Sequence, residues 1–186
     1  MTKIQQSILQ QQFNSAYSKL TQAIKMIEAQ EGSVPYCNGW GSQCTEFYSQ
    51  LAKQLKVVQF CPNKAYEKGC IPQWHGLDDF KGLSDSQKEQ LRKNMSKFCT
   101  NSILNNNIAY VFIDGTILMP YANNSDTFLY DINGKKGPNK WGYDIFYVKI
   151  QPYGENSAKV SYGETLRIES GGKSFDAMVS NMKKHK

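Results

Sequence analysis

Two aspartates and an asparagine in one glycine-rich stretch are the side chains of this sequence best suited to metal chemistry. Asp131, Asn133 and Asp144 lie within DINGKKGPNKWGYD. Their hard oxygens suit a calcium ion, and backbone carbonyls of the stretch could add further ligands. Asp126, or another side chain outside the stretch, is an additional source of oxygen. The pattern therefore indicates Asp131, Asn133 and Asp144 as a candidate calcium site.

A structural role for the same aspartates is the competing interpretation. Three lysines stand in the stretch and give it three positive charges against two negative, at Lys135, Lys136 and Lys140. The spacing is not that of an EF-hand, because Lys135 and Gly142 occupy the fifth and twelfth positions counted from Asp131. In this interpretation Asp131 and Asp144 accept backbone N–H groups and hold the turns. We expect this structural role and no cofactor, with calcium as the alternative.

The cysteines suggest disulfides rather than a zinc site. The five stand at Cys37, Cys44, Cys61, Cys70 and Cys99, without the close pairs that zinc sites use. The short segments CNGWGSQC and CPNKAYEKGC are typical of disulfide-closed turns. We expect a Cys61–Cys70 bond and, as an open possibility, Cys37–Cys44, with Cys99 unpaired. Such bonds would place the protein outside the reducing cytosol.

A catalytic site is difficult to assemble from this sequence. The two histidines are His75, in a stretch typical of a solvated loop, and His185, in a basic tail. Cys99, if unpaired, is more typical of a buried small residue than of a nucleophile. The segment 134–137, GKKG, lacks the spacing and the following helix of a phosphate-binding loop. We therefore expect no enzymatic activity.

Length and charge indicate one ordinary folded domain. The 186 residues carry 22 basic and 16 acidic side chains, for a net charge of +6. Arg92 and Arg167 are the two arginines, and because bidentate base recognition favours arginine, a nucleic-acid partner is unsupported. No apolar run reaches the roughly 18 residues that a membrane-spanning helix needs. A solvated basic surface is the simpler expectation.

A long amphipathic helix over residues 4–29 is the strongest structural prediction. The stretch contains no glycine or proline, and one helical face carries Phe13, Tyr17, Leu20, Ile24 and Ile27. At 1.5 Å per residue it would extend about 39 Å. Ile4 and Ile8 fall on the opposite face. They are either stray residues of a frayed helix end or side chains meant to contact another subunit.

The remaining elements follow from changes in periodicity. We expect a second helix over 45–60, whose apolar stripe is Phe47, Leu51, Leu55 and Val58. A third helix is expected over 84–101 and begins with a Ser84–Gln87 capping box. The loop between them, over 61–82, is closed by the cysteines. Strands are expected at 109–121 (two strands around Asp114-Gly115), at 127–133 and at 144–153. Residues 162–170 form an edge strand or a final turn, and 175–185 form a short, basic, exposed helix. The fold class is α+β, a long N-terminal helix packed on a C-terminal antiparallel sheet of about four strands.

Residues 110–148 also carry a resemblance to a known family. The order Asp-x-Asn-Gly, Gly-Pro-Asn and Gly-x-Asp-x-Phe resembles a loop of bacterial type IV pilin-like proteins and type II secretion pseudopilins. The segment AYSKLTQAIKMIEAQEG resembles the passage in which the pilin spine helix enters its globular head, and LKVVQFC with a second cysteine resembles the cysteine-stapled middle region. The resemblance covers roughly two-thirds of the chain.

This resemblance implies a pilin-like head domain. Its parts would be a spine helix over 1–31, a helical and loop region over 32–107, a sheet over 108–170 and a tail over 171–186. The family's apolar N-terminal membrane segment does not appear in the sequence, so the chain would correspond to the soluble head.

The implied function is a structural subunit of a type IV pilus or a type II secretion pseudopilus. Its partners would be other subunits in a helical filament, through Ile4 and Ile8, and inner-membrane assembly machinery. The location would be the periplasm or the cell surface. The alternative is a surface or secreted binding module, such as an adhesin or a DNA-capturing minor pilin.

Overall fold

The protein is an α+β structure in which one long helix packs on an antiparallel sheet. The computed structural model describes residues 2–34, 44–74, 84–87, 89, 105, 107–120, 127–152, 158–162 and 171–184. The helices within these ranges are α1 (Lys3–Glu31), α2 (Cys44–Leu55) and α5 (Phe175–Lys184). The strands are β1 (Val57–Cys61), β2 (Ala109–Phe112), β3 (Ile117–Pro120), β4 (Thr127–Asp131), β5 (Ile145–Pro152) and β6 (Ala158–Tyr162).

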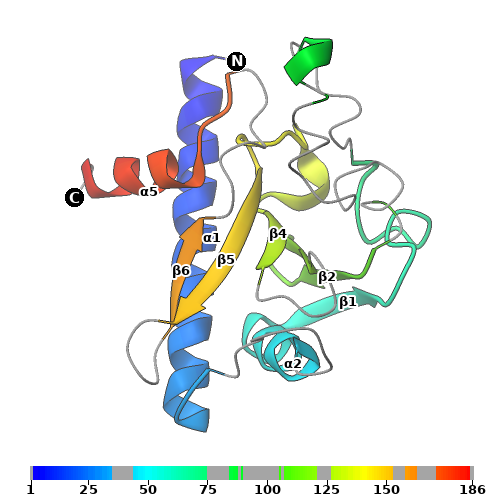
Figure 1. The fold of residues 1–186 in the computed structure, drawn as a ribbon, viewed down its shortest axis with the longest axis vertical. Helices are drawn as coiled ribbons and strands as arrows, with labels where there is room; N and C mark the ends of the chain where they lie inside the picture. Colours follow the sequence, from blue (N-terminus) through cyan, green and yellow to red (C-terminus); the bar gives the residue numbers. More distant parts are fainter. Residues whose placement is uncertain are drawn as a thin grey trace.

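Helix α1 runs along the molecule, with the strands on one side of it (Figure 1). Its start is fixed by a capping box in which the Thr2 hydroxyl accepts from the Gln5 N–H and the Gln5 side chain accepts from the Thr2 N–H. It ends at Gly32, whose φ of 76° is left-handed and whose N–H donates to the Glu28 carbonyl. Phe13, Leu20, Ile24 and Ile27 are buried as the sequence predicts, and Tyr17 is half-buried.

The sheet is a meander in which each strand pairs with the next along the chain. Among the described residues it holds six strands in the order β1-β2-β3-β4-β5-β6, all antiparallel, whereas the sequence pattern predicts about four. The β2–β3 hairpin turns at Asp114-Gly115, and β4 and β5 occupy the predicted segments. Strand β6 precedes the segment expected as an edge strand or turn and shares only Tyr162 with it. Residues 163–170 lie outside the described part.

Both faces of the sheet are buried, which explains why its central strands are apolar without alternation. One face packs on α1, α2 and α5 through Leu118, Phe128 and Phe146. The other face packs, through Ile117 and Leu129, against the segment that carries the Cys61–Cys70 disulfide. Strands covered on both faces carry mostly apolar side chains without alternation, and all residues of β3 and β4 are buried, including the polar Thr127 and Asp131 at the ends of β4.

The second predicted helix ends earlier than expected, and its last residues form a strand instead. Helix α2 stops at Leu55, and Lys56 adopts a φ of 58°, a left-handed conformation that a helix cannot continue through. The β-branched segment from Val57 then pairs with β2. Val58 is consequently 60% exposed, so its predicted place in the core stripe is wrong.

The C-terminal helix is more firmly attached than the sequence suggested. Phe175 and Met178 of α5 are buried, and the Phe175 ring packs edge-on to Phe13 of α1 at 5.1 Å between centroids. Gln10 of α1 donates to the Met178 carbonyl at 3.0 Å and accepts from Asn181 at 3.2 Å. The expectation of an exposed helix is therefore wrong, because the contact between Phe175 and Phe13 holds α5 against α1. Figure 1 shows α5 beside α1.

The predicted third helix falls largely outside the described residues. Its capping box is present, since the Ser84 hydroxyl accepts from the Gln87 N–H and the Gln87 side chain accepts from the Ser84 N–H. Residues 85–87 and Glu89 are helical. Within the described ranges, no helix has the length and apolar character needed to cross a membrane.

Candidate functional site

The loop between β4 and β5 brings the three predicted metal-binding residues together. Asp131 is the last residue of β4, Asn133 precedes the 3-10 turn η3 (Gly134–Lys136), and Asp144 directly precedes β5. The Ile132 N–H donates to the Asp144 carbonyl at 2.9 Å, which closes the loop at its base. Both aspartates are fully buried.

Each aspartate accepts two backbone N–H groups, as the structural interpretation expects. Asp131 Oδ1 accepts from Asn133 at 3.1 Å and from Gly134 at 2.7 Å. Asp144 accepts from Asn139 through Oδ2 and from Lys140 through Oδ1, both at 2.7 Å. Three of the four carboxylate oxygens are therefore committed to holding turns.

The glycine of the first turn is required for a close backbone approach. Gly134 has a φ of 60°, and a Cβ there would collide with the Gly115 carbonyl oxygen of the β2–β3 turn. This contact fixes the β4–β5 loop against the neighbouring hairpin. Any larger residue would force the two turns apart.

Burial makes the two carboxylates costly to ionise. The pKa of Asp131 is raised well above its ordinary value, first by burial and then by the negative charge of Asp144. The pKa of Asp144 is also raised by burial, against the lowering effect of the N–H groups of Lys140 and Asn139. Two buried acids with raised pKa values suit either a shared proton or a bound cation.

The loop offers only part of a calcium site. Three buried oxygens accept no hydrogen bond from the described residues, namely Asp131 Oδ2, Asn133 Oδ1 and Asn139 Oδ1. Calcium takes six to eight oxygens, so three to five more ligands would be needed. No group of three or more His, Cys, Asp or Glu within the described ranges is placed to hold a metal ion. The backbone contacts of the two aspartates thus favour the structural role.

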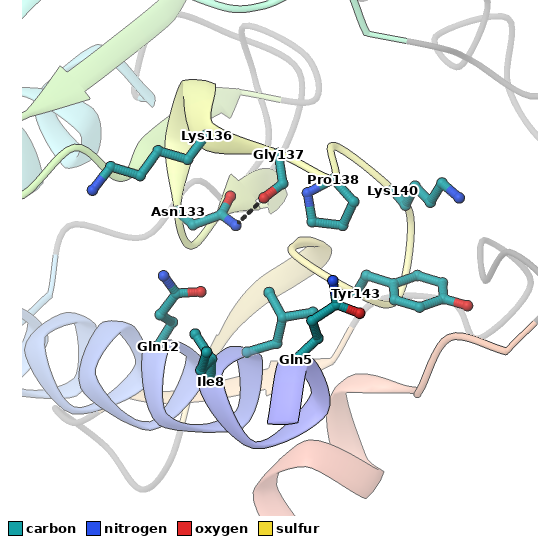
Figure 2. A pocket seen from close by; sticks show the side chains of 10 residues that line it. Gln5, Ile8, Gln12, Asn133, Lys136, Gly137, Pro138, Lys140 and Tyr143 are labelled. Carbon is teal, nitrogen blue, oxygen red and sulfur yellow. Dashed lines mark hydrogen bonds between the residues drawn. The ribbon is translucent and has the colours of Figure 1, made fainter. Parts of the chain in front are cut away.

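A groove separates this loop from the first half of α1 (Figure 2). Its first hollow, of about 510 Å³, lies between the N-terminal turns of α1 and residues 133–143. Its second hollow, of about 350 Å³, continues along α1 toward the β2–β3 turn. Gln12, Asn133 and Lys136 line both hollows and therefore stand where they join. The other residues around the first hollow are Gln5, Ile8, Leu9, Gly137, Pro138, Lys140 and Tyr143.

Exposed isoleucines and lysines both line the groove. Ile8 lines the first hollow at 49% exposure, and Ile113 lines the second at 69%. Lys19, beside the second hollow, forms an ion pair with Asp114 at 2.8 Å. Lys136 and Lys140 are exposed, and no carboxylate of the described part forms an ion pair with either. The ammonium of Lys140 lies 5.8 Å from the Tyr143 ring centroid.

The two predicted subunit-packing residues stay outside the domain core. Ile4 is 72% exposed and Ile8 is 49% exposed, as expected for apolar groups on the face of α1 opposite the stripe. That they contact another subunit stays a prediction. Ile8 also belongs to the groove, whereas Ile4 does not line either hollow.

Of the two predicted disulfides, the structure shows one and does not describe the side chains of the other. Cys61 and Cys70 form a disulfide, with Cα atoms 6.3 Å apart. Cys37 and Cys99 lie outside the described residues, as does the side chain of Cys44, so the second pairing stays a prediction. His75, His185, Asp126 and the acidic pair 78–79 also lie outside the described part.

The groove itself was not anticipated from the sequence. Its helical side, Gln5, Ile8, Gln12, Ser15 and Lys19, has the three- and four-residue spacing of one helix face and could have been recognised. Its other side depends on α1 meeting a loop more than a hundred residues later. Comparison with known proteins adds no precedent, since no family model, curated protein or solved structure matches this chain.

Proposed function

We propose that this chain is a non-catalytic structural subunit of a bacterial filament of the type IV pilus or type II secretion pseudopilus kind. The observation that carries the proposal is the exposure of Ile4 and Ile8 on the first turns of α1. A long helix packed by its other face on an antiparallel sheet is the architecture that the resemblance of residues 110–148 implies. The pilin-like character of the fold is part of this proposal.

Exposed isoleucines at one end of a long helix favour association with other chains. Burying one such side chain is worth about 1.5–3 kcal/mol, and this gain is lost in the isolated domain. In the proposed filament, Ile4 and Ile8 pack against neighbouring subunits, where the gain is recovered. Inner-membrane assembly machinery is the further partner that such a filament requires.

The disulfide supports an extracytoplasmic location. A Cys61–Cys70 bond persists in oxidising compartments and is rare in the cytosol. We therefore propose a location in the periplasm or at the cell surface, with the full-length form held in the inner membrane before assembly.

The source gene provides the test of this proposal. We expect the reading frame to encode, ahead of Met1, an apolar helix of about 20 residues preceded by a short basic leader that ends in glycine. Direct sequencing of the locus and mass spectrometry of the mature protein would establish this. A conventional cleaved signal peptide at that place would contradict the filament proposal.

A surface binding module is the second candidate, and the groove with its unpaired lysines favours it. The first hollow of the groove, of about 510 Å³, falls within the range of about 300–1,000 Å³ that ligand pockets commonly span. DNA capture is a special case, which the lysine-rich composition does not by itself support. Titration with duplex DNA at several salt concentrations tests DNA capture. Binding with a steep salt dependence would support it, because phosphate contacts produce that dependence, and absence of binding at low salt would exclude it.

A further inference from the structure

We propose that the groove beside α1 binds an extended segment of another protein in which one carboxylate stands between two apolar side chains. The two apolar groups would occupy the two hollows, and the carboxylate would face Lys136. This inference goes beyond the filament proposal. The two proposals share Ile8, which lines the first hollow, whereas Ile4 lies outside the groove and Ile113, Lys136 and Gln12 belong to the groove alone.

The length of the groove suits an extended peptide. Its helical side runs from Gln5 to Lys19, which is about 21 Å of helix at 1.5 Å per residue. An extended chain covers that distance in about six residues at roughly 3.3 Å each. Side chains two positions apart point to the same side of such a chain. A segment of the pattern apolar-x-acidic-x-apolar therefore presents all three groups to the groove.

The apolar positions of the segment are set by the exposed isoleucines. Ile8 and Leu9 line the first hollow, and Ile113 and Ile132 line the second. Ile113 is 69% exposed, so most of its side chain is in contact with water unless a partner covers it. One leucine-sized side chain in each hollow would remove apolar surface from water on both partners.

The charge of the groove selects a carboxylate for the central position. Lys136 lines both hollows, so its exposed side chain borders the place where they adjoin. Lys140 adds a second positive charge at the rim of the first hollow. Asp114, which is the one acidic side chain among the described lining residues, is already neutralised by Lys19. An acidic segment therefore meets complementary charge, whereas a basic one would be repelled.

An unpartnered amide oxygen supplies a contact to the backbone of the segment. Gln12 stands at the same junction, and its Oε1 is buried without a hydrogen-bond partner among the described residues. Such an oxygen gains a hydrogen bond if the flexible side chain turns toward an N–H donor. Figure 2 shows Gln12 projecting from α1 toward the loop that carries Asn133 and Lys136. A peptide N–H in the groove is a suitable donor.

Fluorescence anisotropy with a labelled synthetic peptide tests the proposal directly. The probe is the heptapeptide Gly-Leu-Ala-Asp-Ala-Leu-Gly, titrated with the whole chain at low and at physiological salt. We expect saturable binding that weakens at least tenfold when the peptide aspartate becomes asparagine, and at least tenfold when both leucines become serine.

Two pairs of variants separate the groove from general surface charge. Lys136→Glu should weaken binding at least tenfold. Lys135 is an adjacent exposed lysine that does not line the groove, so Lys135→Glu should change binding less than twofold. Ile113→Ser should weaken binding, whereas Ile4→Ser should not. A peptide with lysine in place of aspartate should bind Lys136→Glu better than it binds the wild type. Circular dichroism checks that every variant is folded.

Three results would overturn the inference. Absence of saturable binding at low salt is the first. Equal effects of the Lys135 and Lys136 substitutions are the second, because they would indicate diffuse charge attraction. The third is self-association of the chain in sedimentation velocity that both Lys136→Glu and Ile113→Ser abolish, because a second copy of the chain would then be the occupant of the groove.

Discussion

At the scale of single residues, the two buried aspartates show how position decides the role of a carboxylate. Asp131 and Asp144 could be recognised in the sequence as residues of one loop, either as calcium ligands or as turn anchors. Their burial could not, because it depends on the neighbouring hairpin closing over Gly134. The four backbone N–H contacts give them a structural use that needs no ion.

We expect Asp131→Asn to stabilise the protein at neutral pH, on the order of 1 kcal/mol. An asparagine Oδ1 still accepts the two N–H groups, and the buried charge is removed. The pKa values of Asp131 and Asp144 are raised in the folded state, so the folded protein holds these two protons more tightly than the unfolded chain does. Wild-type stability should therefore fall as pH rises above about 4 and through the raised pKa values. Asp131→Asn should reduce this fall.

Urea unfolding in EDTA at pH 5 and pH 7.5 measures both effects. The same titrations with calcium in place of EDTA provide the control. We expect calcium to leave the wild type unchanged. A rise in its unfolding free energy with calcium, lost in Asp131→Asn, would instead show that the loop is a cation site.

At the scale of secondary-structure elements, α1 carries two faces with different uses. Its buried face holds the aromatic cluster in which Phe13 lies 5.0 Å from Phe146 and 5.1 Å from Phe175, both edge-on. Its opposite face ends in exposed Ile4 and borders the groove through Ile8 and Gln12. The helix thus joins the sheet, α5 and the groove in one element.

Phe13→Ala should destabilise the domain by about 3–5 kcal/mol, because it leaves a cavity at the point where α1, β5 and α5 meet. Ile4→Ala is the matched control on the same helix and should change the unfolding free energy by less than about 0.5 kcal/mol. Urea denaturation followed by circular dichroism compares the two. Similar losses for both substitutions would mean that Ile4 packs inside its own domain.

Elements with a long or unambiguous pattern could be predicted, and those decided by distant pairing could not. Helix α1 follows from a stripe of 3.6-residue period, and the β2–β3 hairpin follows from Asp114-Gly115 between apolar runs. Strand β1 was missed because Val58 continues the helical spacing of Phe47 and Leu51. Only its pairing with β2, more than forty residues later, makes the extended form preferable. The groove was missed for the same reason, since Gln12 and Asn133 meet only in the folded chain.

At the scale of the whole molecule, three exposed isoleucines lie where they can serve contacts with other chains, while Met26, Val58, Phe60 and Tyr66 are exposed elsewhere. Ile4 lies at the N-terminal end of α1, and Ile8 and Ile113 border a groove whose free charges are positive. The domain core, by contrast, is complete on both faces of the sheet. We therefore expect substitutions at Ile4 to affect assembly without affecting the fold.

Ile4→Asp should abolish filament assembly while leaving the isolated domain as stable as the wild type. An aspartate at the second residue of α1 interacts favourably with the helix dipole, so loss of assembly could not be attributed to a weakened helix. Burying the same carboxylate between subunits would cost several kcal/mol and exclude the neighbour.

The measurement is electron microscopy of source cells in which the full-length gene carries Ile4→Asp, alongside urea unfolding of the purified domain. Ile4→Leu is the conservative control and should still assemble. Normal filaments in the Ile4→Asp cells would contradict the role of Ile4 as a subunit contact, and a loss of more than about 1 kcal/mol in the isolated domain would assign Ile4 to the fold instead.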